Sequence, residues 1–171
     1  PKVQPVVRLF SCLVPKAQLA VSIDMGAQKV LAPALAGVRF DPAELPAVGG
    51  PLPAADAFAR GSRSVPLVHL AWGRSGDKGD SANIGIIARK PEFLPFIRAA
   101  ITEQAVARWF AHLARGEVRR YDLPGTQALN FTLQEALGGG GIASVRMDSQ
   151  GKAYAQMLLD HPVAIPAELA V

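Results

Sequence analysis

Glycine, both signs of charge and small polar side chains are concentrated in one stretch of this chain, residues 73–85. Its sequence is Gly-Arg-Ser-Gly-Asp-Lys-Gly-Asp-Ser-Ala-Asn-Ile-Gly. Glycine lets the backbone adopt positive φ and lets a ligand approach the main chain closely, and successive N–H groups in such a turn can form a nest for an anion. Apolar runs at 65–72 and 84–88 flank the stretch, so the pattern predicts a strand, a polar loop and a second strand.

The basic residues of this loop make it a candidate anion-binding site. Arg74 can clamp a phosphate or a carboxylate through two parallel hydrogen bonds, and Lys78 adds a second positive charge. The loop also supplies small polar groups and further glycines for close contact. The candidate ligand-binding residues are Arg74, Ser75, Gly76, Lys78, Gly79, Ser81 and Asn83.

Two carboxylates in the same loop leave other interpretations open. Asp77 and Asp80 repel an anion, and they can instead cap backbone N–H groups or pair with the neighbouring basic residues. With Asn83 they can also offer oxygen ligands to a divalent cation, but the spacing lacks the distal glutamate of a calcium loop, and we assign no metal site. A self-satisfied loop that only joins two strands is the structural alternative.

No catalytic residue can be assigned with the same clarity. The candidates are Asp77, Lys78, Asp80 and His69. His69 lies in an apolar run that predicts a strand, and it can act as an acid or base only if it points toward the loop. We expect Trp72 and Trp109 to fill core, although Trp72, next to the loop, can also line a pocket.

The composition excludes several classes of protein. The chain has 171 residues, a net charge of +4 and one cysteine, Cys12, so it can form neither an internal disulfide nor a cysteine-based zinc site. A single free cysteine fits a reducing compartment, and we expect a cytoplasmic location without membrane contact, because charges or prolines interrupt every apolar run. The chain begins in the middle of a pattern, so we expect it to be a piece of something longer.

The N-terminal third is predicted to hold little regular structure. Two short strands are expected within 3–14 and 17–23, with a turn at 24–26. The segment 31–66 contains many prolines and the pair Gly49-Gly50. Proline removes hydrogen bonds from helices and ladders, so we expect an extended linker with one short helix over 54–59.

From residue 65 onward the apolar periodicity alternates between strand and helix. Pro91 and Glu92 suit a helix start, Thr102 suits a second N-cap, and Gly116 suits a stop. The expected elements, in order, are strands at 65–72 and 84–88, helices at 91–101 and 102–116, a half-exposed edge strand at 117–123, a helix at 128–137 ended by the glycines 138–141, a strand at 142–147, a helix or strand at 152–159 and a strand at 163–165. This order predicts an α+β fold with helices on one face of a mostly antiparallel sheet.

The loop and the segments after it resemble the acyclic terpene utilisation (AtuA-like) family. The matching stretches are 74–80, 83–85, 88–89, 91–92, 129–131, the glycines 138–141, Asp148, 151–152 and 162–166. The resemblance covers roughly 65–166 and implies the C-terminal, ferredoxin-like domain of that family, here 65–171. It implies that 1–30 is a strand pair left from a preceding domain and that 31–64 is the Pro/Gly-rich linker.

The resemblance also implies a function. The family is linked in bacteria to breakdown of citronellol- and geraniol-type terpenoids through coenzyme A thioesters, and a larger N-terminal domain normally precedes this one. We expect residues 73–85 to bind the phosphates of a coenzyme A thioester or an acyl carboxylate. The coenzyme A thioester would be a substrate, and we assign no bound cofactor. Whether this domain catalyses a reaction by itself is left open.

Two other functions stay open. The first is a structural module that drives homo-oligomer assembly and supports the partner domain. The second is an RNA-binding module using Arg119, Arg120 and Tyr121 on a ferredoxin-like sheet. The chain lacks the Gly-Phe-Gly-Phe type of RNA-binding pattern, so we expect no nucleic-acid partner.

Overall fold

The computed structural model describes residues 10, 12–33, 37, 39, 41, 43, 52–53, 55–58, 60–123 and 125–171. The chain divides into two compact units, of which one is Arg8–Pro46 and the other contains Ala47–Val171. Within these described residues, no helix combines the length and the hydrophobicity needed to cross a bilayer.

The N-terminal unit holds a small antiparallel hairpin. Strand β1 (Ser22–Asp24) pairs with β2 (Lys29–Leu31), after a 3₁₀ turn at Lys16–Gln18. The predicted strand pair is confirmed with other bounds: the hairpin forms across the predicted turn at Asp24–Gly26, where Gly26 adopts φ +83° and its N–H donates to Asp24 Oδ1 at 2.9 Å. Most of the segment 3–14 lies outside the described residues.

The larger unit is built on a four-stranded antiparallel sheet in the order β4-β5-β7-β6. The strands are β4 (Ala71–Lys78), β5 (Ser81–Ala88), β6 (Val118–Leu123) and β7 (Ala128–Leu133). From β5 onward the chain follows the strand-helix-strand-strand-helix order of a ferredoxin-like unit. The edge position beside β5 is taken by β4, which precedes it in the chain.

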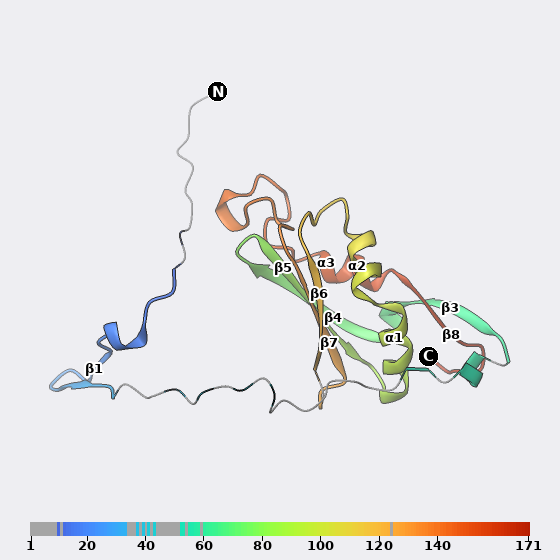
Figure 1. Cartoon of the computed structure of the whole chain (residues 1–171), viewed down its shortest axis with the longest axis horizontal. Coiled ribbons are helices and arrows are strands. Elements are labelled where there is room, and N and C mark those ends of the chain that lie inside the picture. The colour runs from blue at the N-terminus through green and yellow to red at the C-terminus, as the bar shows by residue number, and fades with distance from the viewer. Residues whose placement is uncertain are drawn as a thin grey trace, which may run out of the picture. The chain divides into compact units, whose positions relative to one another are not determined.

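Three short helices lie on one face of this sheet (Figure 1). They are α1 (Leu94–Ala100), α2 (Glu103–Trp109) and α3 (Tyr154–Leu159). A 3₁₀ turn, η5 (Pro91–Phe93), leads into α1. Thr102 caps α2 as predicted, since its Oγ1 accepts a hydrogen bond from the Ala105 N–H at 3.1 Å. The prediction of an α+β fold with helices on one face is confirmed.

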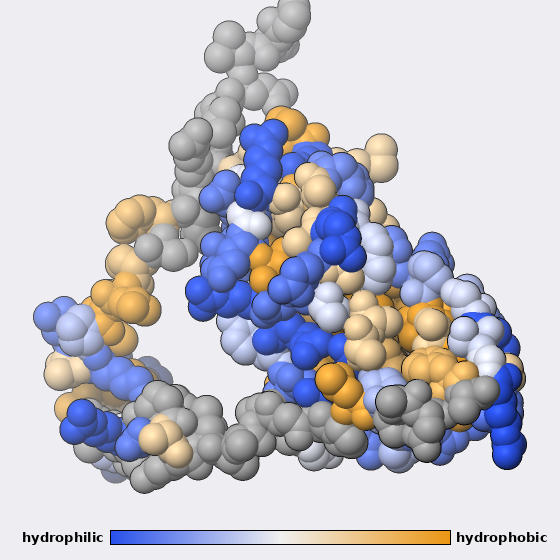
Figure 2. Space-filling model, turned by 45° about the vertical axis from the view of Figure 1, so that its right-hand side comes forward, coloured by the Kyte–Doolittle hydropathy of each residue, from blue (hydrophilic) through white to orange (hydrophobic). Residues whose placement is uncertain are grey.

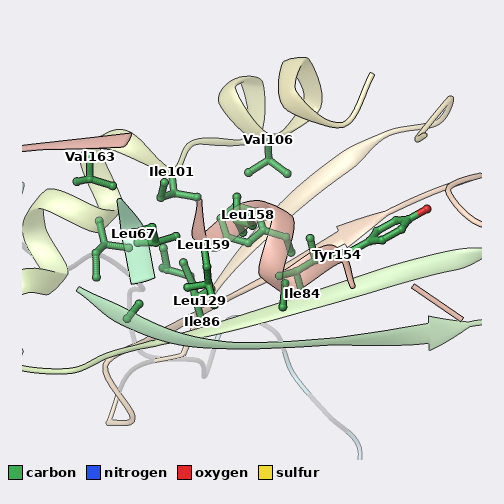
Figure 3. Packing of buried hydrophobic residues seen from close by; sticks show 14 of the residues in the cluster. Leu67, Ile84, Ile86, Ile101, Val106, Leu129, Tyr154, Leu158, Leu159 and Val163 are labelled. Carbon is green, nitrogen blue, oxygen red and sulfur yellow. The ribbon is translucent and has the colours of Figure 1, made fainter. Parts of the chain in front are cut away.

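The core lies between the helices and the inner face of the sheet (Figure 3). Ile84 and Ile86 of β5 are fully buried and face Leu158 of α3, as the close-up shows. The outer face is different, because large apolar side chains stay exposed on it: Trp72, Ile87, Tyr121 and Leu123. On the side of the molecule drawn in Figure 2, hydrophobic residues lie at the surface beside strongly hydrophilic ones. Trp72 is 54% exposed, so the prediction that it fills core was wrong, whereas Trp109 packs against the core.

The glycine-rich stretch is a β-hairpin and not a loop. β4 and β5 stay paired from Ala71↔Ala88 to Lys78↔Ser81, which leaves only Gly79 and Asp80 as the turn. Gly79 adopts φ +65°, the left-handed conformation that glycine permits. Because the residues on either side are extended, the predicted nest of successive N–H groups does not form.

The apolar run 65–72 is likewise not one strand. β3 (Ser62–Pro66) pairs with β8 (Pro162–Pro166), and a 3₁₀ turn, η4 (Leu67–His69), separates it from β4. Pro66 has no N–H to continue a ladder, while the Leu67 N–H donates to the His161 carbonyl at 2.9 Å. The late strand predicted at 163–165 is confirmed as β8.

Two predicted elements change type. The helix expected at 128–137 begins as strand β7, because Leu129, Phe131 and Leu133 are buried with period two between β5 and β6. The strand expected at 142–147 is absent: a 3₁₀ turn, η6, spans Gly141–Ala143, and the side chains after it remain mostly accessible.

Other predicted elements fare better. The edge strand at 117–123 is confirmed as β6, the segment 152–159 proves to be a helix, α3, and a 3₁₀ turn, η3, occupies Ala55–Phe58. Gly116 does not end a helix directly. It lies against Gln134, where an added Cβ would be 2.7 Å from the Gln134 Cβ.

His161 gives the fold a dependence on pH. Its ring stacks on Trp109 with 3.8 Å between centroids, and burial lowers its pKa from the usual 6.5, against a smaller opposing effect of Asp160. A group whose folded pKa is lowered stabilises the fold above its unfolded pKa, and that stability is lost as the pH falls. We expect the free energy of unfolding to decrease below about pH 6.5, and His161→Phe, which keeps the stack, to flatten this decrease. Urea unfolding between pH 8 and pH 5 measures this free energy for both proteins. If the free energy falls equally with pH in the parent and in His161→Phe, the expectation is contradicted.

Candidate anion-binding groove

A hollow of about 390 Å³ lies along β4, the edge strand of the sheet, and we call it the β4 groove. It is lined by Arg74, Ser75, Gly76, Asp77, Lys78, Asn83, Gly85 and Lys152. All but the last come from the β4–β5 hairpin. The structure thus gathers in one place most of the residues that the sequence singled out.

Strand geometry explains the shape of the groove. Side chains alternate along a strand, so Arg74, Gly76 and Lys78 share the outer face of β4. Gly76 pairs with Asn83, and Arg74 pairs with Gly85. Because neither Gly76 nor Gly85 has a side chain, the floor of the groove between the two strands is bare backbone.

Lys152 completes the groove from outside the hairpin. Its Nζ lies 3.8 Å from Asp77 Oδ1 and 3.4 Å from the position that a Cβ on Gly76 would take. Asp77 and Gly76 are neighbours in β4 and therefore point to opposite faces of the sheet. Because Lys152 reaches both, its side chain lies across the free edge of β4. Asp148 holds the turn before it, accepting from the Lys152 and Ala153 N–H groups at 2.8 and 2.9 Å.

The charge around the groove is predominantly positive. Three cationic side chains, Arg74, Lys78 and Lys152, surround it with one carboxylate, Asp77. Lys78 Nζ donates to the backbone carbonyl of Asp77 at 2.9 Å. Within the described part of the chain, the guanidinium of Arg74 has no hydrogen bond or ion pair. Such a site favours an anion that can accept from a planar guanidinium.

Ser75 plays a structural part instead of facing a ligand. It is buried on the inner face, where its Oγ accepts from the Ala155 N–H at 2.9 Å and lies 3.2 Å from the Lys152 carbonyl, to which it donates. The hydroxyl therefore joins β4 to the start of α3. Its two hydrogen bonds leave little capacity for a ligand.

Asp80 is also committed to the fold. Its Oδ1 accepts from the Leu137 and Gly139 N–H groups at 3.2 and 2.7 Å, and its carbonyl accepts from the Ala136 and Leu137 N–H groups. The hairpin turn is thereby fastened to the glycine-rich turn at 138–141. Gly79 and Ser81, which flank Asp80, do not line the groove.

The remaining candidates do not converge on the groove. His69 lies on η4, at the other end of β4, and lines a separate hollow. Among the described residues, no group of three His, Cys, Asp or Glu side chains is placed to hold a metal ion. Asp77 and Asp80 face different partners, so they do not act together on one ion.

Two residues near the groove were missed as site residues from sequence. Lys152 belongs to a turn more than seventy residues away, and only the packing of α3 on β4 brings it there. Asn130 of β7 accepts a hydrogen bond from Asn83 Nδ2 at 3.2 Å through its Oδ1, which orients the Asn83 amide beside the floor. The match of 151–152 to the family pattern was the one available signal for Lys152.

Comparison with known protein families agrees with this architecture. The family model described as the AtuA ferredoxin-like domain matches residues 65–164, which is more than half of the chain. This chain belongs to the AtuA ferredoxin-like domain family. The match begins at the end of β3 and runs into β8, so the AtuA ferredoxin-like domain contains every residue of the β4 groove. No curated protein and no solved structure matches the chain significantly.

Proposed function

We propose that this AtuA ferredoxin-like domain binds an anionic ligand in the β4 groove, namely the phosphates or the acyl carboxylate of a coenzyme A thioester. The proposal places the protein in cytoplasmic breakdown of citronellol- and geraniol-type terpenoids in bacteria. Family membership and the resemblance of residues 74–80 support the pathway. The geometry of the groove supports the ligand class.

The observation that carries the proposal is the unbalanced charge over a glycine floor. Three cations face one carboxylate, and Arg74 lacks a partner among the described residues. Arginine presents a planar fork that matches phosphate and carboxylate oxygens, while lysine contributes a mobile point charge. A pyrophosphate lying over Gly76 and Gly85 would come within reach of both kinds of donor.

The groove has features of a binding site more than of a catalytic one. Asp77 pairs with Lys152, Asp80 accepts backbone N–H groups, and His69 is elsewhere, so no acid–base pair is assembled on the described residues. We therefore assign the chemical step to a preceding AtuA-like N-terminal domain, with this domain holding the ligand.

Calorimetric titration with coenzyme A, acetyl-coenzyme A and inorganic pyrophosphate tests the ligand class. We expect saturable binding by the parent and about tenfold weaker binding for Arg74→Gln and for Lys152→Gln, since a charge-assisted hydrogen bond is worth roughly 1.5–3 kcal/mol and tenfold is about 1.4 kcal/mol. Lys29→Gln, on the exposed strand β2, is the matched control and should bind like the parent. Absence of binding by the parent, or equal binding by all variants, contradicts the proposal.

A structural role is the second candidate, favoured by the exposed apolar residues of the outer sheet face. Trp72, Ile87, Tyr121 and Leu123 keep between 44% and 54% of their surface accessible. Such a face suits assembly into a homo-oligomer. Sedimentation at increasing concentration would show the assembly, and it would account for the domain if no anion binds. RNA binding has less support, because Trp72 and Tyr121, the aromatic residues of this face, lie on the two opposite edge strands β4 and β6 and cannot form one stacking surface for bases.

A further inference from the structure

A second hollow, of about 590 Å³, lies at the end of β4 away from the hairpin turn, and we call it the Trp72 hollow. It shares no lining residue with the β4 groove. Its walls come from η4, from the start of β4, from the residues that follow β5 and from the end of the sequence. Nothing in the proposed function makes use of it.

Four of the residues that line the Trp72 hollow are apolar, namely Val68, Trp72, Phe93 and Val171. Trp72 is 54% exposed and Val68 is 37% exposed, whereas Phe93 is buried. An indole this accessible on a strand offers a large apolar surface whose transfer out of water is favourable.

Cationic side chains also line the hollow. The guanidinium of Arg89 lies 4.8 Å from the Trp72 ring centroid, and its Nε donates to the Val68 carbonyl at 2.8 Å. These contacts hold the side chain in place while its terminal nitrogens have no ion pair within the described part of the chain. The site therefore loses little side-chain freedom when an anion binds.

Lys90 and His69 also line the hollow, and Lys90 adds a second cation. Lys90 Nζ lies 5.3 Å from the Phe93 ring centroid and 3.9 Å from Glu92 Oε1, a contact in which both side chains are at least half exposed. Such a pair contributes little in water, so Lys90 can turn toward a ligand. None of the side chains that line the hollow is acidic.

We infer that the Trp72 hollow binds a small amphiphilic anion. Its apolar body lies against Trp72 and Val68, and its carboxylate or phosphate head is held by Arg89 and Lys90. Apolar walls with a few placed polar groups are the usual composition of a small-molecule site. This inference does not depend on whether the β4 groove binds coenzyme A.

Tryptophan fluorescence tests it directly, because the chain has two tryptophans. Trp109→Phe leaves Trp72 as the only indole and keeps an aromatic ring beside His161. We expect octanoate and octyl phosphate to change its emission saturably, and the tighter of the two identifies the preferred head group. Acetate lacks the apolar body and octanol lacks the charge, so each should bind at least about tenfold more weakly. Calorimetry on the parent chain gives the same comparison if Trp109→Phe does not fold.

Variants separate this hollow from the groove. Arg89→Gln should weaken binding of the better ligand about tenfold, and Trp72→Ala should weaken it at least as much, both by calorimetry. Arg74→Gln, which removes only a guanidinium of the β4 groove, should weaken it much less than Arg89→Gln does. The inference is overturned if neither anion binds saturably, if octanol binds as tightly as the anions, or if Arg74→Gln weakens binding as much as Arg89→Gln.

Discussion

Asp122→Ala is expected to lower the free energy of unfolding by about 3–5 kcal/mol, the usual cost of removing one partner of a buried ion pair. Asp122 Oδ1 lies against Arg98 Nη1, and the side chains are 15% and 9% exposed. Arg98 projects from α1 toward the inner face of β6. Its Nε already has no hydrogen-bond partner among the described residues, so the guanidinium would lose its counter-charge while staying buried.

Urea unfolding of three variants checks this expectation. Glu117→Ala breaks the pair with Arg119, in which both side chains are about half exposed, and should cost much less than Asp122→Ala. The double replacement Arg98→Met with Asp122→Leu removes both charges and should recover most of the stability lost by Asp122→Ala, since apolar replacements of a buried pair are often neutral or stabilising. If Asp122→Ala and Glu117→Ala lower the free energy of unfolding equally, burial does not make the Arg98–Asp122 pair more important for stability than an exposed pair.

Gly140→Ala is expected to destabilise the domain by about 3 kcal/mol or more, through backbone strain and overpacking together. Gly140 adopts φ 69° and ψ 157°, a region that other residues essentially never occupy. A Cβ there would overlap the Gly79 carbonyl oxygen and lie 2.6 Å from its carbonyl carbon. Because those are backbone atoms, the hairpin turn itself must move.

The neighbouring glycine supplies the control. Gly141 has φ +48° and open space around its Cβ position, so Gly141→Ala should cost only about 1–2 kcal/mol of backbone strain. Thermal and urea unfolding compare the two. Displacing the turn also displaces Lys78, so Gly140→Ala should bind coenzyme A more weakly than Gly141→Ala if the groove holds that ligand. A Gly140→Ala domain as stable as Gly141→Ala would mean that the turn can move without cost.

Local patterns determined several elements correctly. Pro91 and Thr102 mark helix starts because their effects act within one turn of the backbone, and the alternation at 117–123 marks a half-exposed strand for the same reason. The string at 74–80 also led to the family, because its glycines and charges form an uncommon combination. Helix caps, strand alternation and short motifs depend on neighbouring residues, so they do not depend on the tertiary packing of the rest of the chain.

Tertiary structure decided the rest, because it depends on partners distant in sequence. Residues 128–133 could satisfy either periodicity, and pairing with both β5 and β6 selected the strand. The predicted binding loop is a hairpin because its backbone carbonyls and N–H groups pair between β4 and β5. Asp80 accepts hydrogen bonds from backbone N–H groups of residues 136–139. The Ser75 hydroxyl is hydrogen-bonded to the start of α3. The Lys152 side chain lies over the free edge of β4. The sequence by itself therefore identified most of the hairpin residues that line the groove, whereas the pairing of β4 with β5 decided which of their side chains face it and the packing of α3 on β4 added Lys152.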